Sequence, residues 1–444
     1  MLKRKVFDAL NKWRSEPHHK SVLLKGQRQV GKTYIVREFG KTYDHFVEFD
    51  FIANPNEKSI FEGSLDADAL IGKMKLYRNP KDFVPGSTLI FLDEVQECPQ
   101  ARTALKQFTM DGKYDVIASG SLLGVSELHR NDSSVPVGYE THIEMRPLDF
   151  EEFLWAAGIE ESAIEQVRGS ISSYVSIEST YLKVFESKFR EYLLVGGMPE
   201  AVQKYVDTKD IMSAHEVIED IMQSALSDIN RYNEGVDKIK VTECFKSIPH
   251  QLDQTNKKFM YSRISGGQSR KSAEKYMDNL LWIKAAGYGI FSYSLCGLEL
   301  PMREDRGSFR VYLSDVGMLC HMYGNSVMRA ILESDYSVNE GAIAENAVAT
   351  CLFRPGHDLM YYNKNGGEDR MELDFIIDTK YGMTAVEVKS GTDKTAKSMI
   401  KASSFFKDNR IMFRDGNVCD EEGIRAYPIF AAAFIDDICP KKED

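Results

Sequence analysis

Short apolar runs alternate with amphipathic segments over the first third of the chain. Val6, Leu10 and Trp13 share one face of a predicted helix. The apolar runs that follow predict strands near Ser21–Lys25, Phe46–Phe49, Leu89–Leu92, Val116–Ala118 and His142–Met145. Because strands of a parallel sheet read as buried runs separated by helices, residues 1–160 are expected to form an α/β domain with helices on both faces of the sheet.

Residues 161–235 have helical spacing throughout. In "YLKVFESKFREYLLVGGMPEAVQKYV", Gly196 and Gly197 end one helix and Pro199 opens the next. We expect this segment to be a helical lid that follows the first domain.

The pattern changes in residues 236–330. One helix is predicted over Lys238–Leu252, and a second begins at the N-cap residue Ser269 and ends at Ala286. The stretches "YGIFSYSL" and "FRVYLSD" then read as two strands joined by a charged loop. Helices followed by a two-stranded wing predict a winged helix-turn-helix.

The segment 331–444 combines a helix, "NEGAIAENAVATCLF", with a strand, "DLMYYNK", and a hairpin, "ELDFIIDTKYGMTAVEVK". A helix near Thr395–Phe406 and strands around Ile411 and Ile429 complete the pattern. The order helix, three strands, helix, strand is that of the PD-(D/E)XK nuclease core. The sequence therefore predicts a C-terminal restriction-endonuclease-like α/β domain.

Composition narrows the class of protein. The chain has 444 residues, 43% of them hydrophobic, and a formal net charge of -11, which disfavours non-specific coating of nucleic acid. The seven cysteines are scattered and lack zinc-site spacing, as expected for reduced thiols. With no signal-peptide or membrane-spanning apolar stretch, we expect a cytoplasmic protein without membrane contact.

The strongest chemical signal lies between the first strand and the next helix. The stretch "GQRQVGKT" fits the phosphate-binding loop GxxxxGK[ST], formed by Gly26, Gln27, Arg28, Gln29, Val30, Gly31, Lys32 and Thr33. Its glycines let backbone N–H groups turn towards phosphates, and the helix N-terminus favours negative charge. Lys32 is expected to reach the β- and γ-phosphates of ATP and Thr33 to ligate Mg²⁺.

Two later strands supply candidate partners for this loop. The run "STLIFLDEVQ" ends in Asp93, which would hold Mg²⁺ through water, and Glu94, which would polarise the attacking water. The strand "YDVIASGS" places Ser119 where it would sense the γ-phosphate, although Ser-Gly-Ser is also ordinary turn chemistry.

The C-terminal hairpin brings acidic and basic residues together. Asp374 and Glu387 are candidate Mg²⁺ ligands, Lys389 would orient the metal-bound water, and Glu345 on the preceding helix would be an outer contact. Exposed hairpins also carry such charges by accident, and such folds also serve as binding modules. The site is therefore expected to be either active or residual.

A basic stretch marks the predicted winged helix. Residues 257–284 contain two acidic residues and seven basic ones, namely Lys257, Lys258, Arg263, Arg270, Lys271, Lys275 and Lys284. Basic residues at the start of a recognition helix suit contacts with DNA phosphates. A solvated helix face and a winged helix used for protein contacts are the alternatives.

Taken together, the motifs resemble a known family. The stretches "GQRQVGKT", "LIFLDEVQECP", "IASGSLLG", "MRPLDFEEFL", "GGMPEAV", "SDINRY", "LSDVGML" and "ELDFII…VEVKS" are similar to those of bacterial and archaeal AAA-type ATPases with a C-terminal PD-(D/E)XK-like domain of unknown function. The resemblance implies binding and hydrolysis of ATP with Mg²⁺ and a link to DNA. Gln27 replaces a frequent proline, and Tyr139 stands where an arginine is expected, so Arg146, Arg130 or no residue takes that role.

Three functions follow from these motifs. The first is an ATPase that couples nucleotide state to a DNA-contacting winged helix and a nuclease-like domain. The second is a slow nucleotide-controlled switch whose nuclease-like domain recruits a partner without cleaving. The third is a DNA-binding module with both sites vestigial, which the intact Lys32, Asp93 and Glu94 oppose. A homo-oligomer and a protein partner are both compatible with the sequence.

Overall fold

The computed structural model describes residues 2–122, 138–231, 238–264, 272–333, 340–364, 366–367, 370–390 and 396–441. The chain divides into two compact units. The first holds Lys3–Arg146 with Ala285–Gly287, and the second holds Pro147–Lys284 with Tyr288–Asp444. These two units are a coarser division than the four domains predicted from the sequence, whose boundaries at residues 160, 235 and 330 stay predictions.

The first unit is built on a five-stranded sheet in the order β2-β3-β4-β1-β5, in which every pairing is parallel. Its strands are β1 (Ser21–Gly26), β2 (His45–Asp50), β3 (Thr88–Asp93), β4 (Asp115–Ser121) and β5 (Glu140–Met145). The predicted parallel sheet is present, and its five strands overlap the five predicted runs.

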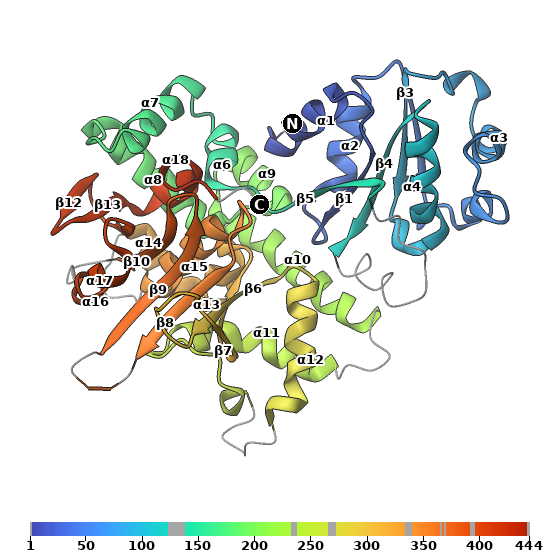
Figure 1. Ribbon diagram of the computed structural model, residues 1–444. Helices are drawn as coiled ribbons and strands as arrows, with labels where there is room; N and C mark the ends of the chain where they lie inside the picture. The colour runs from blue at the N-terminus through green and yellow to red at the C-terminus, as the bar shows by residue number, and fades with distance from the viewer. Residues whose placement is uncertain are drawn as a thin grey trace. The chain divides into compact units, whose positions relative to one another are not determined.

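Helices cover both faces of this sheet (Figure 1). The helical elements are α1 (Lys5–Ser15), α2 (Lys32–Gly40), η1 (Pro55–Phe61), α3 (Ala67–Tyr77), η2 (Pro80–Asp82), η3 (Val95–Glu97) and α4 (Pro99–Asp111). Leu89 and Phe91 of β3 pack with α1 and α2, whereas Ile90 and Leu92 pack with α3 and α4. The alternation along one strand therefore supplies both hydrophobic cores.

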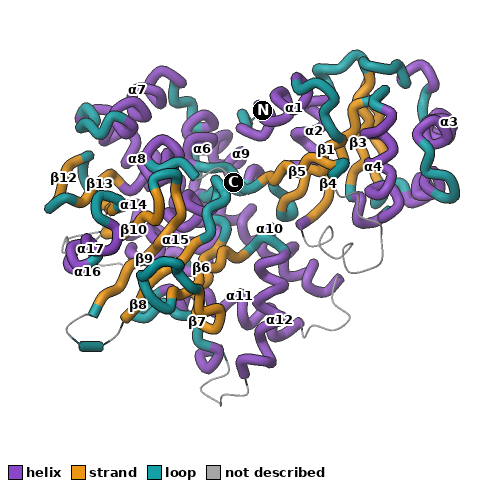
Figure 2. Tube along the Cα trace, in the orientation of Figure 1, coloured by secondary structure: helices purple, strands orange, loops and turns teal. Residues whose placement is uncertain are grey.

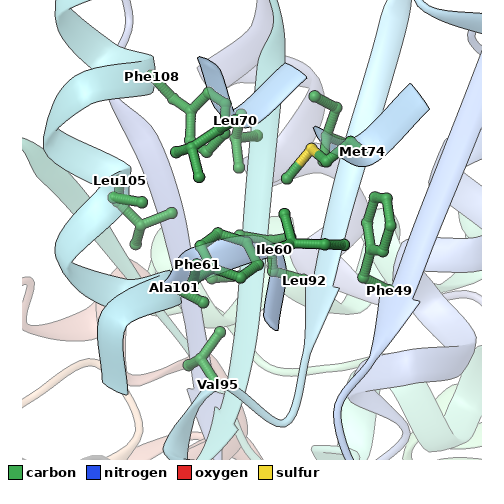
Figure 3. Packing of buried hydrophobic residues seen from close by; sticks show 14 of the residues in the cluster. Phe49, Ile60, Phe61, Leu70, Met74, Leu92, Val95, Ala101, Leu105 and Phe108 are labelled. Atoms are coloured by element: carbon green, nitrogen blue, oxygen red, sulfur yellow. The ribbon is translucent and has the colours of Figure 1, made fainter. Parts of the chain in front are cut away.

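Figure 3 shows the core beneath α3 and α4. Phe49 of β2 and Leu92 of β3 meet Phe61 of η1, Leu70 of α3 and Phe108 of α4, and all five side chains are buried. This packing fixes the ends of β2 and β3, where the polar residues of the nucleotide site begin.

The second unit opens with helices, as predicted for the lid. They are α6 (Phe150–Ala156), α7 (Glu161–Ser172), α8 (Ser179–Val195), α9 (Pro199–Thr208), α10 (Ile211–Arg231), α11 (Lys238–Leu252), η4 (Tyr261–Arg263) and α12 (Ser272–Ala285). The later helical elements are α13 (Val316–Tyr323), α14 (Asn325–Glu333), α15 (Glu340–Phe353), α16 (Lys397–Lys401), α17 (Ser403–Phe406), η5 (Ile429–Phe434) and α18 (Ile435–Ile438). No helix in the described ranges has the length and apolar character that crossing a bilayer requires.

An eight-stranded mixed sheet forms the centre of this unit, in the order β12-β13-β11-β10-β9-β8-β6-β7. Figure 2 draws its strands in orange. They are β6 (Gly289–Leu295), β7 (Glu304–Leu313), β8 (Leu359–Lys364), β9 (Met371–Thr379), β10 (Gly382–Lys389), β11 (Arg410–Arg414), β12 (Cys419–Glu421) and β13 (Ile424–Pro428). Helix α15 lies against this sheet and contacts β6, β7, β8 and β10.

The two strands predicted as a wing belong to this sheet. Strands β6 and β7 pair antiparallel, as expected for a wing, but β6 also pairs parallel with β8. The predicted boundary at residue 330 therefore separates strands that share one sheet. The reason is that β6 has a second hydrogen-bonding edge, which an isolated two-stranded wing would leave open to solvent.

The C-terminal elements follow the predicted order, with two differences. The helix expected over Thr395–Phe406 is two short helices, α16 and α17. The strand expected around Ile429 ends at Pro428, where the helical turn η5 begins. Proline lacks a backbone N–H, so it cannot continue the donor side of a strand ladder.

Three of the sequence motifs meet in the second unit. The backbone N–H of Leu148 donates to the carbonyl oxygen of Gly197 at 2.6 Å, and the N–H of Gly197 donates to Oδ2 of Asp315 at 2.6 Å. Arg354 donates to the carbonyl oxygen of Pro147 at 2.5 Å. The start of the second unit is thus bound to the "GGMP" turn, and that turn is bound to Asp315, the N-cap of α13.

Candidate functional site

The phosphate-loop motif joins the end of β1 to the start of α2. Gly31 has φ +90° and lies at the N-cap of α2, a conformation that favours glycine. A Cβ on Gly26 would lie 2.2 Å from the carbonyl oxygen of Met145 on β5, so no larger residue fits there without moving β5. The two glycines therefore serve two needs, a turn into the helix and close packing of two strands.

Lys32 points back into this loop. Its ammonium group donates to the carbonyl oxygens of Gly26 and Gln27, each at 3.0 Å, and its side chain is buried. Burial lowers the pKa of Lys32 to about 8, although the charges of Glu94 and Asp93 oppose this shift. The loop thus holds a buried cation that gains from an anionic ligand.

The other residues of the loop have different environments. The side chains of Gln27 and Val30 are buried, whereas Gln29 is exposed and has φ +62°. Val30 packs in the core between the sheet and α2, and its carbonyl oxygen accepts from Arg4 at 3.2 Å. The side chain of Val30 therefore belongs to the core, and Val30 contributes only its backbone to the phosphate loop.

Asp93 connects the three candidate motifs. Oγ1 of Thr33 donates to Oδ2 of Asp93 at 2.8 Å, and the hydroxyl of Ser119 donates to Oδ1 of the same carboxylate. Burial raises the pKa of Asp93, while the bonds from Ser119 and Thr33 work in the opposite direction. The Thr33 hydroxyl and the Asp93 carboxylate are in contact at the start of α2. Mg²⁺ prefers such oxygen ligands, so these residues fit Mg²⁺ and ATP.

Glu94 lies directly after β3 with φ +58°, in the left-handed region. Its carboxylate Oε2 accepts a hydrogen bond from Nε2 of Gln96. The backbone N–H of Glu94 donates to Oδ1 of Asp93 at 3.1 Å. The side chain of Glu94 is thus oriented by its own loop.

Two acidic residues at the end of β2 join the predicted site. Glu48, Asp50 and Asp93 can each offer an oxygen atom such that all three lie within 4.8 Å of one another. The parallel register of β2 and β3 pairs Asp50 with Asp93. Both strands end in an aspartate, and that repetition in "HFVEFD" and "LIFLD" was the signal that could have found Asp50.

The C-terminal candidates lie on three adjacent elements. Glu345 is on α15, Asp374 on β9, and Glu387 and Lys389 on β10. The three carboxylate residues are buried, with exposed fractions of 2%, 8% and 6% in that order. Lys389 pairs with Oε1 of Glu387 at 2.8 Å, and Oδ2 of Asp374 accepts from the backbone N–H of Val388 at 3.0 Å.

Two cations from outside the C-terminal motif lie among these carboxylates. Nη1 of Arg310 on β7 is 3.3 Å from Glu345 and 3.7 Å from Asp374, and Nη2 donates to Glu372 at 2.6 Å. Lys257, which follows α11, pairs with the other oxygen of Glu345. The carboxylates are therefore bound by cations of the chain itself.

These cations control the charge of the cluster. Burial alone would raise the pKa of Glu345, but Lys257 and Arg310 outweigh it and lower that pKa. For Asp374, burial and then Glu345 raise the pKa. Burial and then Asp374 raise the pKa of Glu387 to about 8, although Lys389 opposes this shift.

The predicted metal ligands Asp374 and Glu387, with Glu345 as an outer contact, stay a prediction. Within the described ranges, two groups of three acidic, histidine or cysteine side chains bring ligand atoms within 4.8 Å of one another, and this set is neither of them. Arg310 contacts Glu345 and Asp374, and Lys257 contacts the other oxygen of Glu345, so cations of the chain already pair with these carboxylates. Local sequence could not reveal this, because both cations come from the segment predicted as a separate winged helix.

The basic stretch is only partly available for phosphate contacts. Lys257 is bound to Glu345, and Nη1 of Arg263 donates to Gln251 at 3.2 Å. Lys284 donates to the hydroxyl of Tyr293 at 3.3 Å. Arg270 and Lys271 lie outside the described residues, as does the side chain of Lys275. Of the two arginines that could act on phosphate, Arg130 also lies outside the described residues, and Arg146 pairs with Glu144 at 2.9 Å.

Three family models match separate parts of the chain. Residues 18–154 match the model described as an AAA domain. The first unit is an AAA-type P-loop domain. Residues 186–329 and 340–430 match two models described as domains of unknown function, DUF8612 and DUF4143.

Solved structures with similar chains have low identity. A Walker-type ATPase of Pyrococcus abyssi is 12% identical with a TM-score of 0.44, over 73% of this chain and 96% of that one. The ORC2 protein of Aeropyrum pernix, in ADPNP–ADP complexes, is 13% identical with a TM-score of 0.39, over 76% and 95% of the two chains. AMPPCP-bound DnaA from Aquifex aeolicus is 14% identical with a TM-score of 0.27, over 63% and 86%.

Because each of these TM-scores is below 0.5, the three structures do not define the fold or the activity of this chain. No similar sequence was found among the curated proteins. The assignment of the first unit therefore rests on its own sheet, its phosphate loop and the AAA-domain match.

Proposed function

We propose that the first unit binds ATP with Mg²⁺ and hydrolyses it. The observation that carries the proposal is the convergence of Lys32, Thr33 and Asp93 at the start of α2. A buried lysine, a hydroxyl and a carboxylate at a helix N-terminus match the needs of a nucleoside triphosphate and its metal ion.

Each residue has a distinct role in this proposal. Lys32 exchanges its bonds to the loop carbonyls for bonds to the β- and γ-phosphates. Thr33 and Asp93 would hold Mg²⁺, and the ion would supply positive charge beside the phosphate oxygens. Glu94 accepts the proton of the attacking water, and Ser119 positions Asp93.

We further propose that the nucleotide state is transmitted to the second unit, which contacts DNA or a protein partner without cleaving DNA. The chain passes directly from β5 into the turn at Pro147 and Leu148, which is bound to Arg354 and Gly197. The pairing of the C-terminal carboxylates with Arg310 and Lys257 favours the non-cleaving switch over a working nuclease.

A single set of assays tests this proposal. ATP hydrolysis is measured with Mg²⁺, with and without duplex DNA, for the wild type and Glu94→Gln, and the DNA is examined on a gel. We expect Glu94→Gln to retain ATP binding and lose roughly a hundredfold or more in turnover, since it lacks the general base. We expect the duplex to remain intact.

The outcomes separate the alternatives. Turnover by Glu94→Gln at the wild-type rate would exclude Glu94 as the base. Turnover that rises with DNA supports DNA as the partner, and turnover indifferent to DNA supports a protein partner. DNA cleavage that Asp374→Ala abolishes would contradict the non-cleaving role of the second unit.

A further inference from the structure

Three buried carboxylates of the second unit lie among three cations. Glu345, Asp374 and Glu387 each have an exposed fraction below 9%, and burial of an isolated carboxylate is costly. Among the described residues, the cations in this cluster are Lys257, Arg310 and Lys389. A divalent metal ion added to this set would raise its charge above neutrality unless a cation left.

Arg310 bridges two of the carboxylates that a metal ion would have to share. Its guanidinium group is 3.3 Å from Glu345 and 3.7 Å from Asp374, and the side chain is fully buried. A planar guanidinium with several N–H donors suits more than one carboxylate at once. The position between Glu345 and Asp374 is thus already filled by a positive group.

Lys257 completes the arrangement from another segment. It pairs with the oxygen of Glu345 that Arg310 does not contact. Oε1 of Glu345, which Arg310 contacts, also accepts a hydrogen bond from the hydroxyl of Tyr312 at 2.5 Å. Both oxygens of Glu345 are therefore engaged, and a metal ion would have to displace a cation to reach them.

Part of the cluster remains unsatisfied. Oε2 of Glu387 is buried and has no hydrogen-bond partner in the described structure, whereas its Oε1 pairs with Lys389. Such an atom is costly to leave alone and gains from any cation placed beside it. The carboxylates thus keep the capacity for a metal ion that the neighbouring cations exclude.

We propose that Lys257 and Arg310 take the place of a divalent cation, so that Glu345, Asp374 and Glu387 form a latent metal site that opens when one of these cations is removed. This inference does not depend on ATP hydrolysis, because every residue in it belongs to the second unit. It accounts for a carboxylate set with nuclease-like spacing whose members Glu345 and Asp374 pair with cations of the chain.

The test is a Mn²⁺ titration of the full chain without nucleotide. Wild type, Lys257→Met and Arg310→Met are compared by calorimetry and by the shift in unfolding temperature on adding Mn²⁺. Methionine keeps an unbranched apolar stem and removes the charge. Each protein is paired with its Asp374→Asn counterpart, so that only metal binding that needs Asp374 is counted.

We expect no Asp374-dependent Mn²⁺ binding in the wild type. Lys257→Met should gain about one Mn²⁺ per chain with a rise in unfolding temperature, and the paired Asp374→Asn protein should lose both. Arg310→Met, if it folds, should show the same gain of Mn²⁺ binding and of unfolding temperature as Lys257→Met. Because Lys257 is only partly buried, Lys257→Met carries the test if Arg310→Met does not fold.

Two results would overturn the inference. Asp374-dependent Mn²⁺ binding by the wild type would mean that Lys257 and Arg310 do not occupy the metal position. A folded Lys257→Met protein without Asp374-dependent Mn²⁺ binding would mean that the carboxylates have no latent metal site.

Discussion

At the scale of single residues, the phosphate loop is defined by the chemistry of Lys32. Its ammonium group is buried against two backbone carbonyls and has a pKa near 8, so it is poorly stabilised until an anion arrives. The motif predicts the place of this lysine in the loop, and its contact with the β- and γ-phosphates stays a prediction. It could not predict the lowered pKa, which depends on burial by the folded chain.

This pKa predicts how ATP binding responds to pH. Lys32 of the free protein loses its proton as the pH rises through about 8, whereas bound phosphates favour the charged ammonium. ATP affinity should therefore be level below pH 8 and fall by up to about tenfold per pH unit above it. Isothermal titration from pH 7 to 9.5 measures this, with proton uptake on binding at the higher values.

The matched control is Lys32→Arg, since an arginine stays charged throughout this range. Its ATP affinity, whatever its absolute value, should not change with pH. A wild-type affinity that stays constant to pH 9.5 would contradict the low pKa of Lys32.

Asp93 and Asp50 differ in how far the sequence alone predicts them as site residues. Asp93 was predicted because it follows an apolar strand and precedes a second acid. Asp50 gives no such signal, because Glu48 interrupts the apolar run of its strand. Only the register of β2 with β3 places Asp50 beside Asp93. Register between strands that are distant in sequence is a property of the sheet and cannot be read from either strand alone.

At the scale of elements, the close packing of β1 against β5 depends on Gly26. A Cβ there would lie 2.2 Å from the carbonyl oxygen of Met145, a backbone atom that cannot rotate away. The phosphate-loop motif requires this glycine for ligand approach, and the structure adds a packing reason. The apolar pattern predicted both strands but not the distance between them.

We therefore expect Gly26→Ala to lower the free energy of unfolding of the first unit by about 1–3 kcal/mol, because the strands must separate. Gly72→Ala is the matched control. Gly72 lies inside α3 with no atom within 4 Å of an added Cβ, so alanine there should stabilise by about 0.5–1 kcal/mol. Urea unfolding of both variants measures the difference, and equal effects of the two substitutions would contradict the packing argument.

At the scale of the whole molecule, one sheet joins segments that read as separate domains. The sequence predicted β6, β7 and the hairpin β9–β10 correctly as strands, yet it placed them on either side of a domain boundary. The parallel pairing of β6 with β8 links residues that lie more than sixty positions apart in the chain, as Ser292 with Leu359. Local patterning contains no signal for such a pairing.

This arrangement predicts which fragments fold. A fragment of residues 331–444 lacks β6, which covers an edge of β8, and lacks Lys257 and Arg310, which neutralise Glu345. The shorter fragment should therefore show no cooperative unfolding transition. A fragment of residues 147–444 should unfold cooperatively. Urea unfolding followed by circular dichroism compares the two, and a cooperative transition in the shorter fragment would contradict the single sheet-based unit.

The most direct test of the central claim is ATP hydrolysis with Mg²⁺ by the wild type and Lys32→Ala, purified in parallel. The proposed site predicts measurable turnover in the wild type and loss of both ATP binding and turnover in Lys32→Ala, with the circular dichroism spectrum unchanged. Equal turnover in the two proteins, or an absence of ATP binding by the folded wild type, would contradict the assignment of the phosphate loop as the nucleotide site.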